Sequence, residues 1–152
     1  MSREILFRGK AINRKPNYEY RTNYRNGDWV YGLLTDAENY AGFAEMTNTD
    51  GVSGIDVDKD TIGQYTGLTD KNGNKIFEGD IIFFEDESPS NYEYHDCTEM
   101  RCGEVKFDDA QFYLTNRIAV EMSDLIYDGT LEGEVIGNIH DNPELLKGGA
   151  EE

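Results

Sequence analysis

Apolar and polar residues alternate along most of this chain, and that period of two restricts its fold more than any other feature. Trp29, Tyr31 and Leu33 alternate directly after the turn dipeptide Asn26-Gly27. Successive side chains of an extended chain point to opposite faces, so the pattern predicts strands with one buried and one wetted face. We therefore expect a mainly β protein.

Further segments of the same kind predict short strands separated by polar turns. The turn at residues 70–74 is the clearest, because Asp and Asn side chains bond local amides and Gly73 accepts left-handed geometry. Residues 119–127 suit either a strand or a short helix. The strands expected from the pattern are 4–8, 28–34, 43–46, 55–57, 62–65, 75–77, 81–84, 103–107, 111–114 and 134–139.

Two other segments lack this alternation. Residues 85–101 are rich in polar residues and predict a long exposed loop. Asn142, Pro143 and Glu144 predict the start of a short C-terminal helix, because they supply a capping side chain, a preset φ and an acid at the positive helix end. We expect residues 148–152 to be a disordered tail.

Charge is distributed unevenly along the sequence. The 152 residues include 14 Lys and Arg against 31 Asp and Glu, a formal net charge of −17, which disfavours binding of duplex nucleic acid over a broad basic face. Residues 1–25 hold seven basic and two acidic residues, a net charge of +5, which leaves −22 for the remainder. Aromatic residues between the basic ones favour an ordered strap or a contact between copies over a nucleic-acid-binding arm.

The sequence also restricts the compartment. It has no apolar run of about 18 residues that could span a membrane, and charged residues near its start leave no room for a signal segment. Its two cysteines fit a reducing environment better than a disulfide-stabilised secreted fold. We expect the protein to stay in the cytoplasm where it is made, with no membrane partner.

Four residues could form a metal site. His95, Cys97, Cys102 and His140 would offer two nitrogens and two thiolates, a tetrahedral set that suits zinc. The short spacing typical of zinc knuckles is absent, so we interpret them as ordinary surface or partly buried side chains and expect no metal or cofactor.

No arrangement of residues indicates catalysis. The sequence has no Gly-x-Ser-x-Gly elbow, phosphate-binding loop or dinucleotide fingerprint, and only two histidines that could act as bases. We predict that the protein is not an enzyme. A metal-assisted enzyme stays open as an alternative.

Four segments of the sequence match one known pattern: residues 3–8, 29–32, 64–81 and 135–146. Together they resemble the YopX family, small proteins encoded by phages and prophages of mainly Gram-positive bacteria. The resemblance implies a partly open SH3-like β-barrel with long loops. It also implies a single YopX-like domain of residues 1–147, with halves 1–65 and 66–147, in a bacterial host cytoplasm. The role of the family is unsettled, so no catalytic residues are implied.

The central segment supplies the candidate binding residues. Its glycines fall where the backbone turns, and its aspartates can bond local amides, so we interpret it first as a folding device and alternatively as a partner-binding surface. The candidates are Gln64, Tyr65, Thr66, Gly67, Asp70, Asn72, Gly73, Glu78, Gly79 and Asp80.

These observations predict a non-enzymatic binding protein that acts on a phage or host protein. The sharpest version is a DNA-mimic inhibitor, because an acidic surface with tyrosines can compete for basic, nucleic-acid-binding surfaces. The alternative is a nucleic-acid-binding module that uses the basic N-terminal segment on an SH3-like barrel. Association into homo-oligomers is a further expectation, since the basic segment and acidic remainder are complementary between copies.

Overall fold

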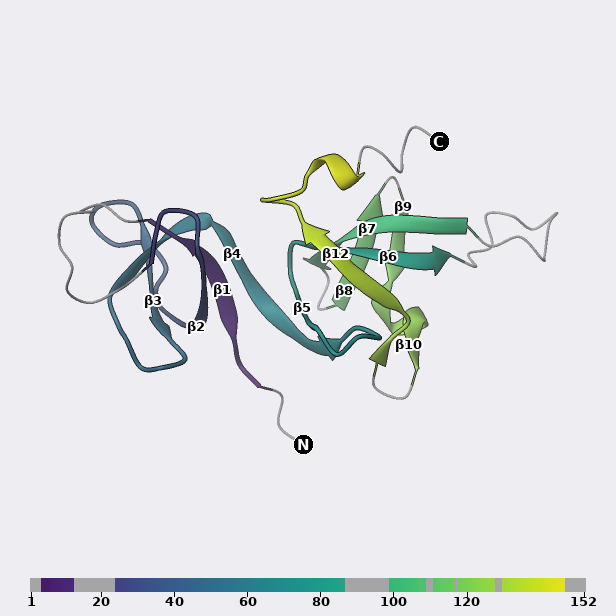
Figure 1. Ribbon diagram of the computed structural model, residues 1–152, viewed down its shortest axis with the longest axis horizontal. Coiled ribbons are helices and arrows are strands. Elements are labelled where there is room, and N and C mark those ends of the chain that lie inside the picture. The colour runs from purple at the N-terminus through teal and green to yellow at the C-terminus, as the bar shows by residue number, and fades with distance from the viewer. Residues whose placement is uncertain are drawn as a thin grey trace. The chain divides into compact units, whose positions relative to one another are not determined.

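The structure is a computed structural model that describes residues 4–12, 24–86, 99–108, 111–116, 118–127 and 130–146. Within these residues the chain is mainly β, as predicted (Figure 1). The strands are β1 (Phe7–Ala11), β2 (Trp29–Asp36), β3 (Ala44–Asn48), β4 (Ile55–Thr69), β5 (Lys75–Phe77), β6 (Asp80–Asp86), β7 (Glu99–Asp108), β8 (Gln111–Asn116), β9 (Ile118–Glu121), β10 (Ile126–Tyr127), β11 (Thr130–Leu131) and β12 (Gly133–Asn138).

Helical structure is confined to two short pieces of the described chain. A 3₁₀ helix, Met122–Leu125, follows β9, so the ambiguous segment 119–127 contains both strand and helix. One helical turn at residues 144–146 follows Asn142-Pro143, at the predicted helix start. The Asn142 side chain accepts a hydrogen bond from the Asn138 amide at 3.3 Å and so holds the end of β12. The predicted tail, residues 148–152, lies outside the described residues.

The chain divides into two compact units, Met1–Tyr65 and Thr66–Glu152. One strand, β4, crosses this boundary and is a continuous ribbon in Figure 1. The sequence predicted two strands here, at 55–57 and 62–65, because the apolar alternation is interrupted between them. The alternation breaks at Lys59 and Asp60, which are both exposed, and resumes at Thr61. Thr61 is buried and satisfies its hydroxyl with the Lys10 amide and the Asp58 carbonyl, at 2.8 and 2.6 Å. That both halves form a single domain stays a prediction.

The first unit is a ring of paired strands. β1 pairs with β2 and β4, and β3 also pairs with β2 and β4, all antiparallel. Each of these strands therefore has a partner on both sides, which is how barrels avoid free edges. Inside lies a core of Ala11, Val30, Ala44, Met46, Ile55 and Val57. The closed ring of pairings agrees with a barrel, so it supports the prediction of an SH3-like barrel in part.

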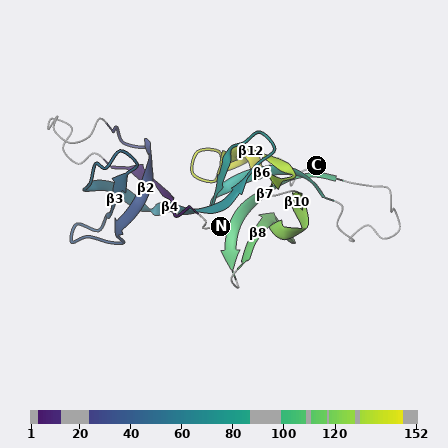
Figure 2. The ribbon, with the colours of Figure 1, turned by 90° about the horizontal axis from the view of Figure 1, so that it is seen from below.

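The second unit contains an antiparallel sheet in the order β12-β6-β7-β8-β9. Figure 2 shows β12, β6 and β7 side by side. The end of β4 pairs with β5 and, in parallel, with β11, which pairs with β10. The core of this unit is Ile76, Ile82, Phe84, Val105, Leu114, Met122 and Leu131.

The prediction of a long loop at 85–101 is wrong at both ends of that segment. β6 extends to Asp86 and β7 begins at Glu99, and these two residues pair with each other. The strand ends are held by backbone pairing and carry charged side chains, so they give no apolar signal. Residues 87–98 lie outside the described part of the chain.

Three hairpin loops, at residues 39–43, 48–52 and 70–74, share one arrangement. Each begins with Asn or Asp, whose side-chain Oδ1 accepts hydrogen bonds from the amides of the third and fifth loop residues. The fourth residue is Gly42, Gly51 or Gly73, with φ of 87°, 89° or 84°. Its amide donates to the carbonyl of the first residue. The pattern Asn/Asp-x-x-Gly-x therefore directs three successive hairpins, β2–β3, β3–β4 and β4–β5.

The packing around β2 gives a test of the ring. Gly32 lies between Phe7 on β1 and Asn48 on β3, and a Cβ added there would overlap the Thr47 carbonyl oxygen. We expect Gly32→Ala to lower the free energy of unfolding by about 3 kcal/mol or more, measured by urea denaturation, because backbone cannot yield as a side chain can.

The matched control is Gly42→Ala. A Cβ at Gly42 meets nothing within 4 Å, so only its left-handed backbone opposes the change, at a cost of about 1–2 kcal/mol. Equal losses of stability in the two variants would contradict the close approach of β2 and β3.

Candidate functional site

The ten candidate residues of the central segment are not gathered on one exposed surface. Five of the ten are at least partly accessible to solvent: Gln64 and Glu78 are half-buried, and Gly67, Asn72 and Gly73 are exposed. The other five candidates are buried: Tyr65, Thr66, Asp70, Gly79 and Asp80. This distribution supports the interpretation of the segment as a folding device.

Two buried side chains of the segment close turns. Thr66 Oγ1 donates to the Ile76 carbonyl at 2.9 Å, which joins β4 to β5. Asp80 Oδ2 accepts from the Phe77 amide at 2.8 Å, across the turn between β5 and β6. Gly79 in that turn has φ of 88° and donates its amide to the Val105 carbonyl at 2.9 Å. The turn is thereby attached to β7.

Asp70 accepts hydrogen bonds on both carboxylate oxygens and is only 1% exposed. Its Oδ1 accepts from the Asn72 and Asn74 amides at 2.9 and 2.8 Å. Its Oδ2 accepts from the Val135 amide at 2.9 Å and from the Asn74 side-chain amide at 3.2 Å. One carboxylate therefore holds both its own turn and a strand 65 residues away.

The Asp70 turn covers the outer edge of β12, which is one of the two edge strands of its sheet. Besides the bond from Val135, the Lys71 amide donates to the Gly133 carbonyl at 3.2 Å. Unpaired backbone groups on an edge strand can pair with other chains, so such cover protects the sheet.

The pKa of Asp70 reflects the same contacts. Burial raises the pKa, whereas the hydrogen bonds from Val135, Asn74 and Asn72 lower it. The donors outweigh burial, and the pKa lies below its ordinary value. Asp70 is therefore a charged structural residue at neutral pH.

The metal candidates are only partly covered by the structure. Cys102 is half-buried on β7 opposite Phe83, and His140 is half-buried just after β12. His95 and Cys97 lie outside the described residues. Within the described ranges, no three His, Cys, Asp or Glu side chains lie where they could hold a metal ion.

Glu104 on β7 has a raised pKa. Burial raises it, and the positive charge of Lys106, two residues along the strand, lowers it in part. A general acid needs such a raised pKa, but catalysis needs a reacting partner as well. That the protein is not an enzyme stays a prediction.

Cationic and aromatic side chains share the outer face of β1 and β2, here called the outer β1–β2 face: Arg8, Lys10, Trp29, Tyr31 and Leu33. The register places Lys10 opposite Trp29 and Arg8 opposite Tyr31. Arg8 Cζ lies 4.6 Å and Lys10 Nζ 5.4 Å from the centre of the Trp29 ring. Tyr31 and Leu33 are 40% and 52% exposed. Alternation predicted the shared face of β2, but its cationic neighbours depend on strand register.

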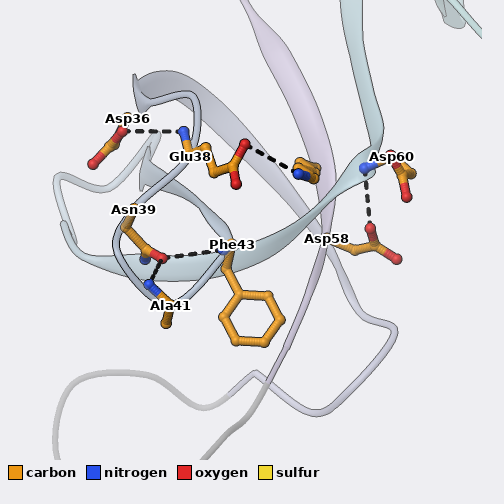
Figure 3. A network of polar contacts seen from close by, with 8 residues as sticks. Asp36, Glu38, Asn39, Ala41, Phe43, Asp58 and Asp60 are labelled. Atoms are coloured by element: carbon orange, nitrogen blue, oxygen red, sulfur yellow. Dashed lines mark hydrogen bonds and ion pairs between the residues drawn. The ribbon is translucent and has the colours of Figure 1, made fainter.

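The loop at residues 39–43 belongs to a polar network (Figure 3). Figure 3 shows Asn39 Oδ1 accepting from the Ala41 and Phe43 amides. Asn39 Nδ2 donates to the carboxylates of Glu45 and Asp56, at 2.8 and 3.1 Å. The loop is thus tied to β3 and β4.

Nearby acids in Figure 3 also have structural contacts. Glu38 pairs with Lys59 at 3.1 Å, and Asp58 Oδ1 accepts from the Asp60 amide at 3.0 Å. Tyr40 in the same loop is 99% exposed, which makes it a surface residue rather than part of the core.

The two units differ in net charge. The first unit, residues 1–65, has eight Lys and Arg against ten Asp and Glu, a net charge of −2. The second unit, residues 66–152, has six against 21, a net charge of −15. Nearly all of the acidic excess therefore lies in the second unit.

Comparison with known proteins gives a matching family and similar solved structures. The family model described as YopX protein matches residues 14–147. The crystal structure of protein EF1440 from Enterococcus faecalis is 27% identical and has a TM-score of 0.51, over 95% of this chain and 99% of that chain. No curated protein matches. None of the helices in the described ranges is long and apolar enough to cross a membrane.

The Asp70 contacts predict a specific effect of Asp70→Asn. Asparagine can keep the two loop bonds through Oδ1, as Asn39 and Asn48 do. Its amide nitrogen would face the donors of Val135 and Asn74, where Oδ2 now accepts. We expect a loss of about 2–3 kcal/mol in the free energy of unfolding at neutral pH.

The same variant tests the pH dependence. Because the pKa of Asp70 is lowered in the folded state, the charged carboxylate stabilises the fold above the unfolded pKa of about 3.9, and this is lost as pH falls through the folded pKa. Asp70→Asn should therefore lose less stability below about pH 4 than the parent protein. Exposed Asp50→Asn is the control; equal acid sensitivity of parent and Asp70→Asn would contradict the assignment.

Proposed function

The chain belongs to the YopX family, and we propose that it is a non-enzymatic phage or prophage accessory protein that binds a protein of the phage or of its bacterial host. The observation that carries this proposal is the net charge of −15 in the second unit. A field of one sign steers an oppositely charged partner toward the surface that bears it.

The partner that fits such a field is a protein with a basic surface. Basic surfaces commonly serve to bind nucleic acid, so the acidic unit would compete with nucleic acid for the same site, as a DNA mimic does. The exposed acids in the described part of the second unit are Glu85, Glu132, Asp141 and Glu144.

Aromatic anchors accompany the acidic charge. Tyr127 on β10 is 73% exposed, and Phe107 on β7 is 52% exposed with its ring centre 4.8 Å from that of Phe112. Charge guides association, whereas buried aromatic anchors usually supply much of the binding energy. The second unit offers both kinds of group.

The proposal predicts a partner whose association slows steeply with salt. The immobilised protein should capture a basic protein from host lysate at low salt and release it when duplex DNA is added. With that partner purified, the association rate should fall at least tenfold between low and moderate ionic strength.

A pair of triple variants tests the unit responsible. Glu85→Gln, Glu132→Gln and Glu144→Gln together should slow association severalfold, because they remove three exposed charges of the second unit. Asp36→Asn, Asp50→Asn and Asp60→Asn remove as many exposed charges from the first unit and should have much less effect. Empty capture, a salt-independent rate, or equal effects of the two triples would overturn the proposal.

A further inference from the structure

The outer β1–β2 face differs in character from the rest of this acidic chain. Trp29, Tyr31 and Leu33 form a row on β2, and Lys10 and Arg8 stand opposite the first two on β1. The strand β1 also lies within residues 1–25, whose net charge is +5. Aromatic rings beside positive charges attract ligands that have both flat π-systems and negative charge.

We infer that this face is a binding site for single-stranded nucleic acid, with bases stacked on Trp29 and Tyr31 and the backbone phosphates near Lys10. This inference goes beyond the proposed function, because it concerns a different unit and a different class of ligand. It does not depend on the acidic surface of the second unit.

The spacing of the rings favours a single strand over a duplex. Residues two apart on a strand are about 6.8 Å apart, twice the roughly 3.4 Å between stacked bases of a duplex strand. Bases of a single strand can separate and stack on aromatic side chains individually. The net charge of −17 also opposes the broad phosphate contacts that duplex binding needs.

The cations have two different roles in this site. Arg8 is 5% exposed and lies 4.6 Å from the centre of the Trp29 ring, so it holds the ring in position. Lys10 is half-buried on the same face and is the cation closer to solvent. Asp58 on β4 stands opposite Lys10, so the basic surface ends at β1 and the proposed path follows β2.

Trp29 gives a direct readout, because it is the only tryptophan in the chain. Titration of the intact protein with a single-stranded oligonucleotide of mixed sequence should quench Trp29 fluorescence to saturation at low salt. The duplex of the same sequence should bind at least tenfold more weakly. The logarithm of the affinity should fall linearly with the logarithm of salt concentration.

Matched variants distinguish binding at this face from a general effect of removing an exposed tyrosine or a positive charge. Tyr31→Ala and Lys10→Glu should each weaken single-strand binding about tenfold. Exposed Tyr40→Ala and Lys59→Glu, in the same unit, are the controls and should leave it nearly unchanged. Circular dichroism and urea unfolding establish that each variant is folded. If Tyr31→Ala proves unstable, Tyr31→Phe replaces it and should retain binding, because the aromatic ring is kept.

Three results would overturn the inference. One is fluorescence that no oligonucleotide changes, and another is equal weakening by Lys10→Glu and Lys59→Glu. The third is quenching by polyglutamate and not by oligonucleotides, which would assign the face to an acidic protein instead.

Discussion

The buried carboxylate of Asp70 is the constraint on which the second unit depends. A charge that is withdrawn from water is costly unless donors replace the lost solvation, and here four hydrogen bonds do so. Three of those donors come from its own turn and the fourth from β12. The same two oxygen atoms therefore hold the local turn and a distant strand. Loss of either set of donors would leave part of the buried carboxylate without hydrogen bonds.

Comparison of the three related loops shows what the carboxylate adds. Asn39 and Asn48 organise their loops with one oxygen and use the amide nitrogen as a donor, to Glu45 and Asp56 or to the Tyr24 hydroxyl. At residue 70 the second atom must accept, because it faces backbone and side-chain N–H groups. The choice between Asn and Asp at the first loop position thus follows from whether the groups that face the second side-chain atom are acceptors or donors.

Sequence reasoning recovered the local features and missed those that depend on distant partners. The β character, the 70–74 turn and the shared face of Trp29, Tyr31 and Leu33 follow from neighbours in the sequence. The continuity of β4 was missed because two consecutive exposed residues, Lys59 and Asp60, break the apolar alternation and a threonine occupies the next buried position. The bond between Asp70 and Val135 joins residues 65 apart, and no local pattern encodes it. The candidate residues were recognised by resemblance, and only the structure shows that half of them are buried.

The passage of β4 through the boundary at residues 65 and 66 has a consequence for how such a chain can evolve. Gene recombination usually exchanges parts at flexible linkers, where few contacts are cut. Here the boundary falls inside a strand whose residues pair with β1 before it and with β5 and β11 near its end. A replacement for either unit would have to preserve that strand's extended geometry and its inward-facing pattern. We therefore expect the two units, despite their different charges, to be exchanged less readily than units joined by a flexible linker.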